Sequence, residues 1–220
     1  MQYLIDASVY VFRAYYSMPD DMVDDAGNPV NALYGFCRFL GDFMEQVTPE
    51  FVAVAFDESL SSSFRTEIYP EYKANRDPAP EELKRQFQQC RRFVRALGVM
   101  EIASPRYEAD DLIGTLVEHG RGHGRPSTIV SRDKDLTQLL RGDDVFWDFA
   151  GKGKLRYEEI EGSFGVRPEQ IADFLALAGD AVDNIKGVPG VGKKTAEKLL
   201  QHFGTLDEIY DNLHRVHEVN

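Results

Sequence analysis

The chain has 220 residues, with 37 acidic side chains against 25 basic ones and a formal net charge of −12. This length allows one ordinary domain with at most a small appendage, and a hydrophobic fraction of 43% is typical of a folded globular protein rather than a disordered chain. No stretch is apolar for long enough to span a membrane, and the acidic total argues against a general basic coat for nucleic acid.

Four short apolar runs are predicted to be strands buried on both faces. In chain order they are Tyr3–Ile5, Phe51–Phe56, Thr128–Val130 and Val145–Phe149. Helical periodicity between them, at residues 33–43, 83–97 and 112–117, predicts an α/β domain whose parallel strands are joined by right-handed crossovers. After residue 168 the strand signal stops, and the pattern predicts helices near residues 171–178 and 196–203. We therefore expect an α/β core over residues 1–167 and a helical region over residues 168–220.

The two cysteines, Cys37 and Cys90, lie among apolar periodic residues and form no C-x-x-C pair. We interpret them as small buried side chains without a disulfide. The N-terminus has no basic region before its first apolar run, which Asp6 interrupts, so we expect no signal peptide. These features predict a cytoplasmic protein.

Carboxylates gather where the predicted strands end and where later helices begin. The carboxyl ends of parallel strands meet at one edge of a sheet, so side chains there are expected to lie close together. A single Asp in such a place could simply cap the next helix, and acids in a first helical turn are favoured by the helix dipole. Several carboxylates in one place repel each other unless a cation neutralises them. The full set is Asp6, Asp57, Glu108, Asp110, Asp111, Asp133, Asp135, Asp180 and Asp183.

Oxygen donors without His or Cys favour hard cations, so this set predicts Mg²⁺ or Mn²⁺ rather than Zn²⁺. Nine carboxylates exceed the needs of one ion, and we expect two or more. Paired hard cations serve in-line displacement at phosphorus, where one generates the nucleophile and the other stabilises the leaving oxygen. The predicted chemistry is hydrolysis of phosphodiesters.

Two competing motifs fail on their details. The segment from Gly187 to Lys193 is one residue short of a P-loop, because Lys194 stands where Ser or Thr must bind Mg²⁺ and no strand precedes it. His119 and His123 are separated and flanked by glycines, so we expect surface histidines rather than metal ligands.

Basic residues are concentrated in two stretches despite the acidic total. Residues 61–100 are net positive and interleave bases with Phe64 and Tyr69, a mixture that can neutralise phosphates and stack nucleobases. A solvated helix face is the alternative for its later arginines. Lys73 and Arg76 lie in a polar segment with no apolar period, and we expect them to have a functional role.

The second basic stretch surrounds a glycine-rich turn at residues 187–192. Glycines around a Pro-Gly turn, followed by a helix start, expose backbone N–H groups that suit phosphate oxygens, and Lys193 and Lys194 stand beside them. This pattern is typical of a helix-hairpin-helix, which grips duplex backbone without reading sequence. A plain packing corner between two helices is the alternative.

Seven segments of the chain carry a resemblance when they are read in order. They are I-D-A-S around Asp6, F-D-x₆-F-R from Phe56, Y-K-A-N-R from Tyr72 with Pro80 and Leu83 after it, Y-E-A-D-D from Tyr107, D-K-D-L from Asp133, A-G-D-x-x-D-N-I from Ala178, and the hairpin at residues 187–192. Together they resemble the 5′-nuclease family, which comprises bacterial flap endonucleases and the 5′→3′ exonuclease domain of DNA polymerase I.

The resemblance implies a Rossmann-like, mostly parallel nuclease core with a helical arch at about residues 64–97. It implies one ion held by Asp6, Asp57, Glu108 and Asp110. It implies a second ion surrounded by Asp133, Asp135, Asp180 and Asp183, with Asp111 nearby or bridging. Lys73 and Arg76 would contact the scissile phosphate and stabilise the charge that develops on it.

Further DNA contacts follow from the same resemblance, with K⁺ as an optional ion at the hairpin. They are Arg13, Arg65, Tyr72, Gly187, Val188, Gly190, Gly192, Lys193 and Lys194. The implied substrates are DNA with 5′ flaps, 5′ ends or branched junctions, cleaved to a 5′-phosphate and a 3′-hydroxyl by a monomeric enzyme.

Two departures and one alternative remain. Arg132 stands where relatives usually have Gly, and the chain ends at Asn220, soon after the hairpin, so a compact stand-alone nuclease and a part of a longer chain both stay open. The alternative function is a structure-specific DNA-binding module that has lost catalysis, against which the complete set of carboxylates argues. Without those nine, 28 acidic residues face 25 basic ones, so the acidity does not exclude DNA.

Overall fold

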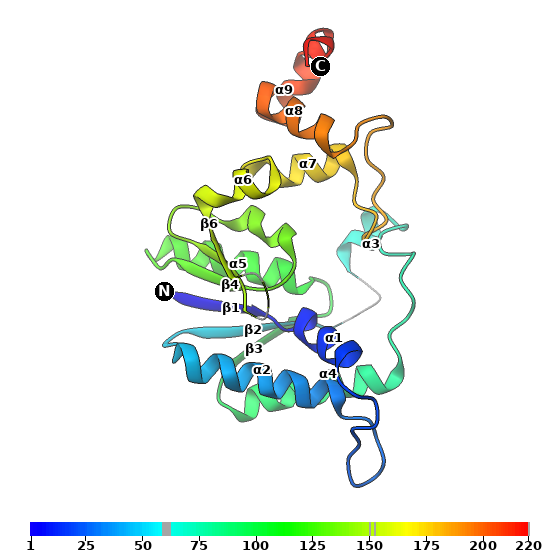
Figure 1. Cartoon of the computed structure of the whole chain (residues 1–220), viewed down its shortest axis with the longest axis vertical. Helices are drawn as coiled ribbons and strands as arrows, with labels where there is room; N and C mark the ends of the chain where they lie inside the picture. Colours follow the sequence, from blue (N-terminus) through cyan, green and yellow to red (C-terminus); the bar gives the residue numbers. More distant parts are fainter. Residues whose placement is uncertain (59–62, 150, 152, 220) are drawn as a thin grey trace.

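The computed structural model describes residues 1–58, 63–149, 151 and 153–219. Its centre is a six-stranded sheet (Figure 1) with the order β3-β2-β1-β4-β5-β6. The strands are β1 (Gln2–Asp6), β2 (Val52–Asp57), β3 (Met100–Ser104), β4 (Ser127–Val130), β5 (Val145–Asp148) and β6 (Gly153–Arg156). Neighbouring strands from β3 to β5 pair in parallel, and β6 pairs antiparallel with β5. The mostly parallel α/β core is confirmed.

All four predicted strands are present, and β3 and β6 were missed. β3 carries a glutamate and a serine and is only partly buried, so it lacks the continuous apolar run of its neighbours. β6 alternates half-buried and exposed residues at the sheet edge and contains Lys and Arg. An edge strand that relies on one neighbour has little sequence signal of its own.

Helices cover both faces of the sheet, because successive strand residues point to opposite sides. On one face, Ile5 and Val54 pack with α1 (Ala7–Ser17), α2 (Asn31–Val47) and α4 (Glu81–Ala96). On the other face, Leu4 and Ile129 pack with α5 (Ala109–Gly122) and with the C-terminal helices. The helix α1 was not anticipated from the sequence.

The expected arch at about residues 64–97 is shorter than the resemblance implied. The apolar side chains of α4, among them Leu83, Phe87 and Val94, are buried against α2 and the sheet, so this helix belongs to the core. Its strong amphipathic pattern is the physical reason, since such a face must be covered. What lies at the carboxylate edge is the short helix α3 (Phe64–Ile68) and the turns that follow it up to residue 80.

The chain after β6 is helical, and its helices begin at residue 157, before the expected start at residue 168. It comprises α6 (Ile160–Phe164), α7 (Ile171–Ala178), α8 (Lys193–Phe203) and α9 (Leu206–Asp211), with 3₁₀ helices η2 (Tyr157–Glu159), η3 (Pro168–Gln170) and η4 (Leu213–Glu218). Figure 1 shows α7, α8 and α9 extending from the sheet to one end of the molecule. Leu177, Leu199 and Leu200 are buried in the same cluster as the α5 face of the sheet, so this region packs on the core.

Both cysteines are free, as predicted, with Cys90 buried and Cys37 half-buried. Among the described residues, no helix combines the length and the apolar character that crossing a membrane requires.

Candidate metal and nucleic-acid site

Two strand ends place the first carboxylates of the site. Asp6 ends β1 and is only 3% exposed, and its Oδ2 accepts a hydrogen bond of 2.8 Å from the Ser131 hydroxyl after β4. Asp57 ends β2, and its Oδ1 accepts a hydrogen bond of 2.8 Å from the backbone N–H of Ala109, at the start of α5. Asp6 therefore connects β1 to the loop after β4, and Asp57 connects β2 to the start of α5.

Four aspartates at this edge form a cluster of like charge. Burial raises the pKa of Asp6 to about 7, and the charges of Asp57 and Asp133 add to that effect. Burial likewise raises the pKa of Asp110 well above its usual range, followed by the charges of Asp6, Asp133 and Asp57. Such a group retains protons unless cations balance its charge. The sheet edge thus provides a cluster of buried carboxyl groups whose ionised form needs a cation to balance it.

A second carboxylate group lies between η1 (Lys134–Leu139) and the turn after α7. Asp133 Oδ1 accepts a hydrogen bond of 2.9 Å from the backbone N–H of Asp135. Burial raises the pKa of Asp135 to about 6, and the charges of Asp133, Asp180 and Asp183 contribute, while Lys193 opposes them. Asp180 Oδ1 accepts a hydrogen bond of 2.8 Å from Val182 N–H, which shapes the turn. Segments almost fifty residues apart are thereby brought close enough for their charges to act on Asp135.

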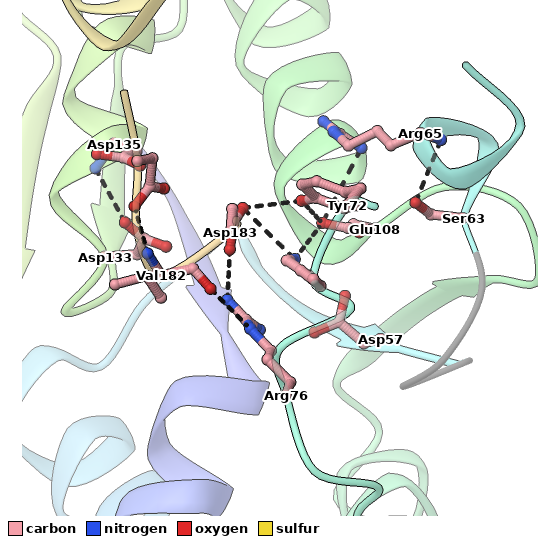
Figure 2. A network of polar contacts seen from close by, with 12 residues as sticks. Asp57, Ser63, Arg65, Tyr72, Arg76, Glu108, Asp133, Asp135, Val182 and Asp183 are labelled. Atoms are coloured by element: carbon pink, nitrogen blue, oxygen red, sulfur yellow. Dashed lines mark hydrogen bonds and ion pairs between the residues drawn. The ribbon is translucent and has the colours of Figure 1, made fainter. Parts of the chain in front are cut away.

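The segment after α3 places its polar side chains on two of these carboxylates (Figure 2). The Tyr72 hydroxyl lies 3.0 Å from Glu108 Oε2 and 2.9 Å from Asp183 Oδ2. Lys73 Nζ donates to Glu108 Oε2 at 2.8 Å and lies 3.9 Å from Asp183 Oδ2, and Arg76 pairs with Asp183. In this structure the two predicted phosphate-binding cations therefore neutralise carboxylates of the site.

Glu108 shows the effect of those cations on its ionisation. Burial acts to raise its pKa, but the hydrogen bond from Lys73 and the charges of Lys73 and Arg65 outweigh burial and lower the pKa. The Glu108 carboxylate is consequently held ionised, with Lys73 as its present partner.

Asp111 lies in a different environment from the one expected. Its two carboxylate oxygens accept hydrogen bonds of 2.7 and 2.8 Å from the Arg65 guanidinium, and Oδ2 also accepts one of 2.9 Å from Glu108 N–H. Asp111 therefore fastens α3 to the start of α5 instead of joining either carboxylate group. Arg65, predicted as a DNA contact, is the other half of this ion pair.

The glycine-rich turn lies between α7 and α8, with Lys193 and Lys194 exposed in the first turn of α8. Gly187 packs directly on Gly179, and Val188 N–H donates to Leu177 O at 2.9 Å. Gly190 has a φ of +84°, which glycine adopts without strain, and Gly192 is the residue before α8. Arg13, the remaining predicted DNA contact, is exposed on α1 and does not belong to this turn.

Two hollows adjoin the carboxylates. One, of about 900 Å³, lies between the α3 region and α7 and is lined by Ile68, Tyr69 and Leu175 together with Asp110 and Asp135. The other, of about 610 Å³, is lined by Phe64, Tyr107 and Leu139 and shares Arg65, Asp110 and Gln138 with the first. Open space with partly apolar walls therefore reaches the anionic site.

The donor atoms are close to one another without forming a finished cage. Over the described residues, no three His, Cys, Asp or Glu side chains stand together in an arrangement that could hold an ion as they are. The donor set nevertheless consists of oxygens only, and its buried charges lack balance at the sheet edge. These residues fit hard divalent cations, provided that side chains rotate and Lys73 leaves Glu108.

Two contributors to the site were missed from the sequence. The Ser131 hydroxyl donates to Asp6 and accepts from Asp133 N–H at 2.9 Å, and the Ser8 hydroxyl accepts from Asp57 N–H at 3.2 Å. Both serines lie two residues from a strand-end aspartate, which is the only signal the sequence offered. The motif F-D-x₆-F-R crosses residues 59–62, which lie outside the described residues.

Comparison with known proteins assigns the chain to a family. Residues 1–165 match the profile of the 5′-3′ exonuclease N-terminal resolvase-like domain, and residues 166–220 match that of the 5′-3′ exonuclease C-terminal SAM fold. A 5′-3′ exonuclease of Aquifex aeolicus is 36% identical over 210 residues, which are 96% of this chain and 72% of that protein. DNA polymerase I of Pseudomonas aeruginosa is 40% identical over 217 residues, which are 98% of this chain and 24% of that protein.

Solved structures show the same fold at lower identity. The T5 D15 protein co-crystallised with metal ions has a TM-score of 0.80 at 22% identity, over 96% of this chain and 79% of that one. Flap endonuclease-1 from Methanococcus jannaschii has a TM-score of 0.63 at 14% identity, over 99% of this chain and 76% of that one.

The fold is the one that solved 5′-exonuclease and flap-endonuclease structures share. The chain belongs to the 5′-3′ exonuclease family, since its two profiles together span residues 1–220. It spans about a quarter of the length of the DNA polymerase I relatives that it matches.

Proposed function

We propose that this chain is a divalent-metal-dependent, structure-specific 5′-nuclease that hydrolyses DNA at 5′ flaps, 5′ ends and branched junctions. The observation that carries the proposal is the anionic cluster at the sheet edge, bordered by Lys73 and Arg76. Family membership supplies the reaction class, and the cluster supplies a place for the cations that phosphodiester hydrolysis uses.

Two groups of carboxylates would hold the ions, which we propose to be Mg²⁺ or Mn²⁺. The first group is Asp6, Asp57, Glu108 and Asp110, and the second is Asp133, Asp135, Asp180 and Asp183. When bound, the ions supply a nucleophilic hydroxide and stabilise the leaving oxygen, which gives a 5′-phosphate and a 3′-hydroxyl. Asp111 is left out of both groups because Arg65 holds both of its oxygens.

Lys73 and Arg76 would exchange partners during substrate binding. In the structure they lie on Glu108 and Asp183, where they keep two carboxylates from separate segments together. A phosphate arriving over these carboxylates offers both cations a new partner, and the charge that develops on it strengthens the contact. The Tyr72 hydroxyl would keep Glu108 and Asp183 in place during the exchange.

The helical region would bind the duplex beside the cut. Its turn at residues 187–192 presents backbone N–H groups, with Lys193 and Lys194 next to them, and K⁺ is a further candidate ligand there. Exposed Arg13 could contact another phosphate. We propose a monomeric enzyme of the cytoplasm.

Replacing Asp133 by alanine tests the proposal against the alternative of a binding module without catalysis. We expect Asp133→Ala to abolish turnover of a 5′-flap substrate in Mg²⁺. The affinity for the same DNA in EDTA should stay within about threefold, because the variant loses one repulsive charge and does not lose a phosphate contact. Asp42→Ala, on an exposed face of α2, is the matched control and should behave as wild type. Full turnover by Asp133→Ala would remove this residue from the reaction.

A further inference from the structure

Arg132 is a basic residue at the rim of the carboxylate site that the proposed reaction does not use. It lies between Ser131 and Asp133, just after β4. The Ser131 hydroxyl donates to Asp6 and accepts from Asp133 N–H, so hydrogen bonds on both sides fix the backbone at residue 132. The Arg132 side chain therefore starts from a rigid position next to the proposed metal ligands.

The present contact of Arg132 is weak. Its Nε lies 3.5 Å from Oδ2 of Asp148, at the end of the neighbouring strand β5, and the Arg132 side chain is 46% exposed. The Asp148 side chain is only 15% exposed, so this is not a surface pair, but Arg132 engages it through Nε alone at a distance longer than that of a charge-assisted hydrogen bond. The guanidinium keeps several N–H donors that a phosphate can engage in a bidentate manner.

Asp148 explains why Arg132 does not neutralise the site. The Oδ1 atom of Asp148 is buried and has no hydrogen-bond partner within the described residues, so this carboxylate retains an unmet demand for a donor or a cation. The Arg132 Nε lies on Asp148 rather than on a carboxylate of the proposed metal site. The Arg132 guanidinium consequently lies beside the carboxylates of the site without pairing with them.

The position of Arg132 complements that of the other cations. Lys73 and Arg76 lie on Glu108 and Asp183, which belong to α5 and the turn after α7. Arg132 lies on the β4–β5 part of the edge, and the order β2-β1-β4-β5 places Asp57, Asp6 and Asp133 along the way. A DNA strand that crosses the carboxylates from one side to the other would meet cations at both ends of its path.

We propose that Arg132 is a substrate-positioning residue of this chain, which leaves Asp148 to bind a non-scissile phosphate of the DNA strand on the β4–β5 side of the site. The inference rests on the proposed function, because it requires DNA to lie over the carboxylate edge.

The salt dependence of DNA binding tests this assignment without any cleavage. Affinity for a 5′-flap duplex is measured in EDTA over a range of salt concentrations for wild type, Arg132→Gln, Arg132→Lys and the control Arg38→Gln. Arg38 is 69% exposed and lies 4.0 Å from Asp42 on α2, so it is a weakly paired surface arginine away from the proposed site. We expect Arg132→Gln to lower the slope of log K against log salt by about 0.7–0.9 and the affinity by about tenfold at low salt. Arg132→Lys should retain most of both, and Arg38→Gln should match wild type.

A scan of single methylphosphonates along the flap strand locates the contact. One neutral linkage, away from the cleaved one, should weaken wild type by about tenfold and leave Arg132→Gln unchanged, because that variant no longer makes the contact. In Mg²⁺, Arg132→Gln should raise KM and leave kcat within about twofold. An unchanged salt slope, or equal sensitivity of both proteins at every linkage, would overturn the proposal.

The outcomes separate this inference from the proposed function. If wild type does not cleave the flap in Mg²⁺ but Arg132→Gln still lowers the salt slope of binding, the nuclease proposal fails while the contact of Arg132 stands. If wild type cleaves and Arg132→Gln binds identically, only the role of Arg132 fails. If wild type does not bind the flap at all, both are overturned.

Discussion

Asp6 shows at the scale of one residue how the site is prepared for a cation. The side chain is almost fully buried, its Oδ2 accepts from Ser131, and its pKa is raised to about 7 by burial and by the charges of Asp57 and Asp133. A folded-state pKa above the unfolded value of 3.8 means that the native protein binds more protons than the unfolded chain between these pH values. The free energy of unfolding must then fall as pH rises through this window.

Metal-free protein should therefore be less stable at pH 8 than at pH 5, with Asp135 and Asp110 acting in the same direction. Urea unfolding in EDTA at the two pH values measures the difference. Mg²⁺ should restore stability at pH 8, since an ion that binds only the folded state stabilises it. Asp6→Asn, which removes the charge and keeps the shape, should flatten the pH dependence. A higher urea midpoint at pH 8 than at pH 5 in EDTA would contradict the raised pKa values.

Lys73 is the second residue on which the account depends. Its backbone φ is +54°, its N–H donates to Asp183 O at 3.0 Å, and its side chain lies on Glu108. A non-glycine residue held in the left-handed region by tertiary contacts is often found at a functional site. The strained backbone aims the ammonium group at the carboxylates, where the scissile phosphate is expected.

Lys73→Ala should slow cleavage on the order of 10²-fold or more, as expected when a group that stabilises transition-state charge is lost. The single-turnover rate of flap cleavage at saturating Mg²⁺ is the appropriate measurement. Lys84→Ala, on the exposed face of α4 and paired with Glu81, is a control that should retain the wild-type rate. A Lys73→Ala enzyme with an unchanged single-turnover rate would exclude Lys73 from the reaction.

At the scale of elements, the turn between α7 and α8 combines a packing role with the proposed binding role. A Cβ at position 187 would lie 2.4 Å from Gly179 N and 2.5 Å from Leu177 O, which are backbone atoms that cannot move aside independently. At position 192 a Cβ would meet nothing within 4 Å. The two glycines of one motif therefore serve different purposes.

Gly187→Ala should destabilise the protein by about 2 kcal/mol or more, because the backbones of α7 and the turn must separate, whereas Gly192→Ala should have little effect. Thermal unfolding of both variants provides the comparison. Duplex affinity should fall in Gly187→Ala as the turn shifts. Equal melting temperatures for the two variants would mean that the close approach of Gly187 and Gly179 is not a constraint.

The elements also show which parts of the fold the sequence could predict. Strands buried on both faces have continuous apolar runs, so β1, β2, β4 and β5 were predictable, whereas β3 and the edge strand β6 depend on tertiary pairing. The helix α4 was recognised by its period, but its assignment to an arch came from the resemblance, and only its packing on α2 revealed that it belongs to the core. A periodic pattern indicates that a face is covered but not by what.

The site was predictable to a similar extent. Strand-end position was enough to bring Asp6, Asp57 and Asp133 together, because parallel strands share one carboxyl edge. Which carboxylates are engaged elsewhere depends on side-chain partners from distant segments. The pairing of Asp111 with Arg65, across 46 residues, therefore had no sequence signal. The bridging of Glu108 and Asp183 by Tyr72 was hidden for the same reason.

For the whole molecule, the net charge of −12 conceals an uneven distribution of acidic and basic residues. The acids concentrate at the sheet edge, where bound divalent ions would reverse the local sign, while cations lie around that edge on Lys73, Arg76, Arg132 and the start of α8. DNA binding should accordingly strengthen when divalent ions occupy the site and weaken steeply with salt. An acidic total is thus compatible with a nucleic-acid substrate.

The central claim is that this chain uses divalent ions at its carboxylate edge to cut DNA from a 5′ end or flap. The most direct test incubates the purified protein with a 5′-flap duplex labelled on either strand, in EDTA and in Mg²⁺, and identifies both new ends. The account predicts no cleavage in EDTA, cleavage near the flap junction in Mg²⁺, and products that carry a 5′-phosphate and a 3′-hydroxyl. Cleavage that persists in EDTA, or binding of the flap without cleavage in either Mg²⁺ or Mn²⁺, would contradict it.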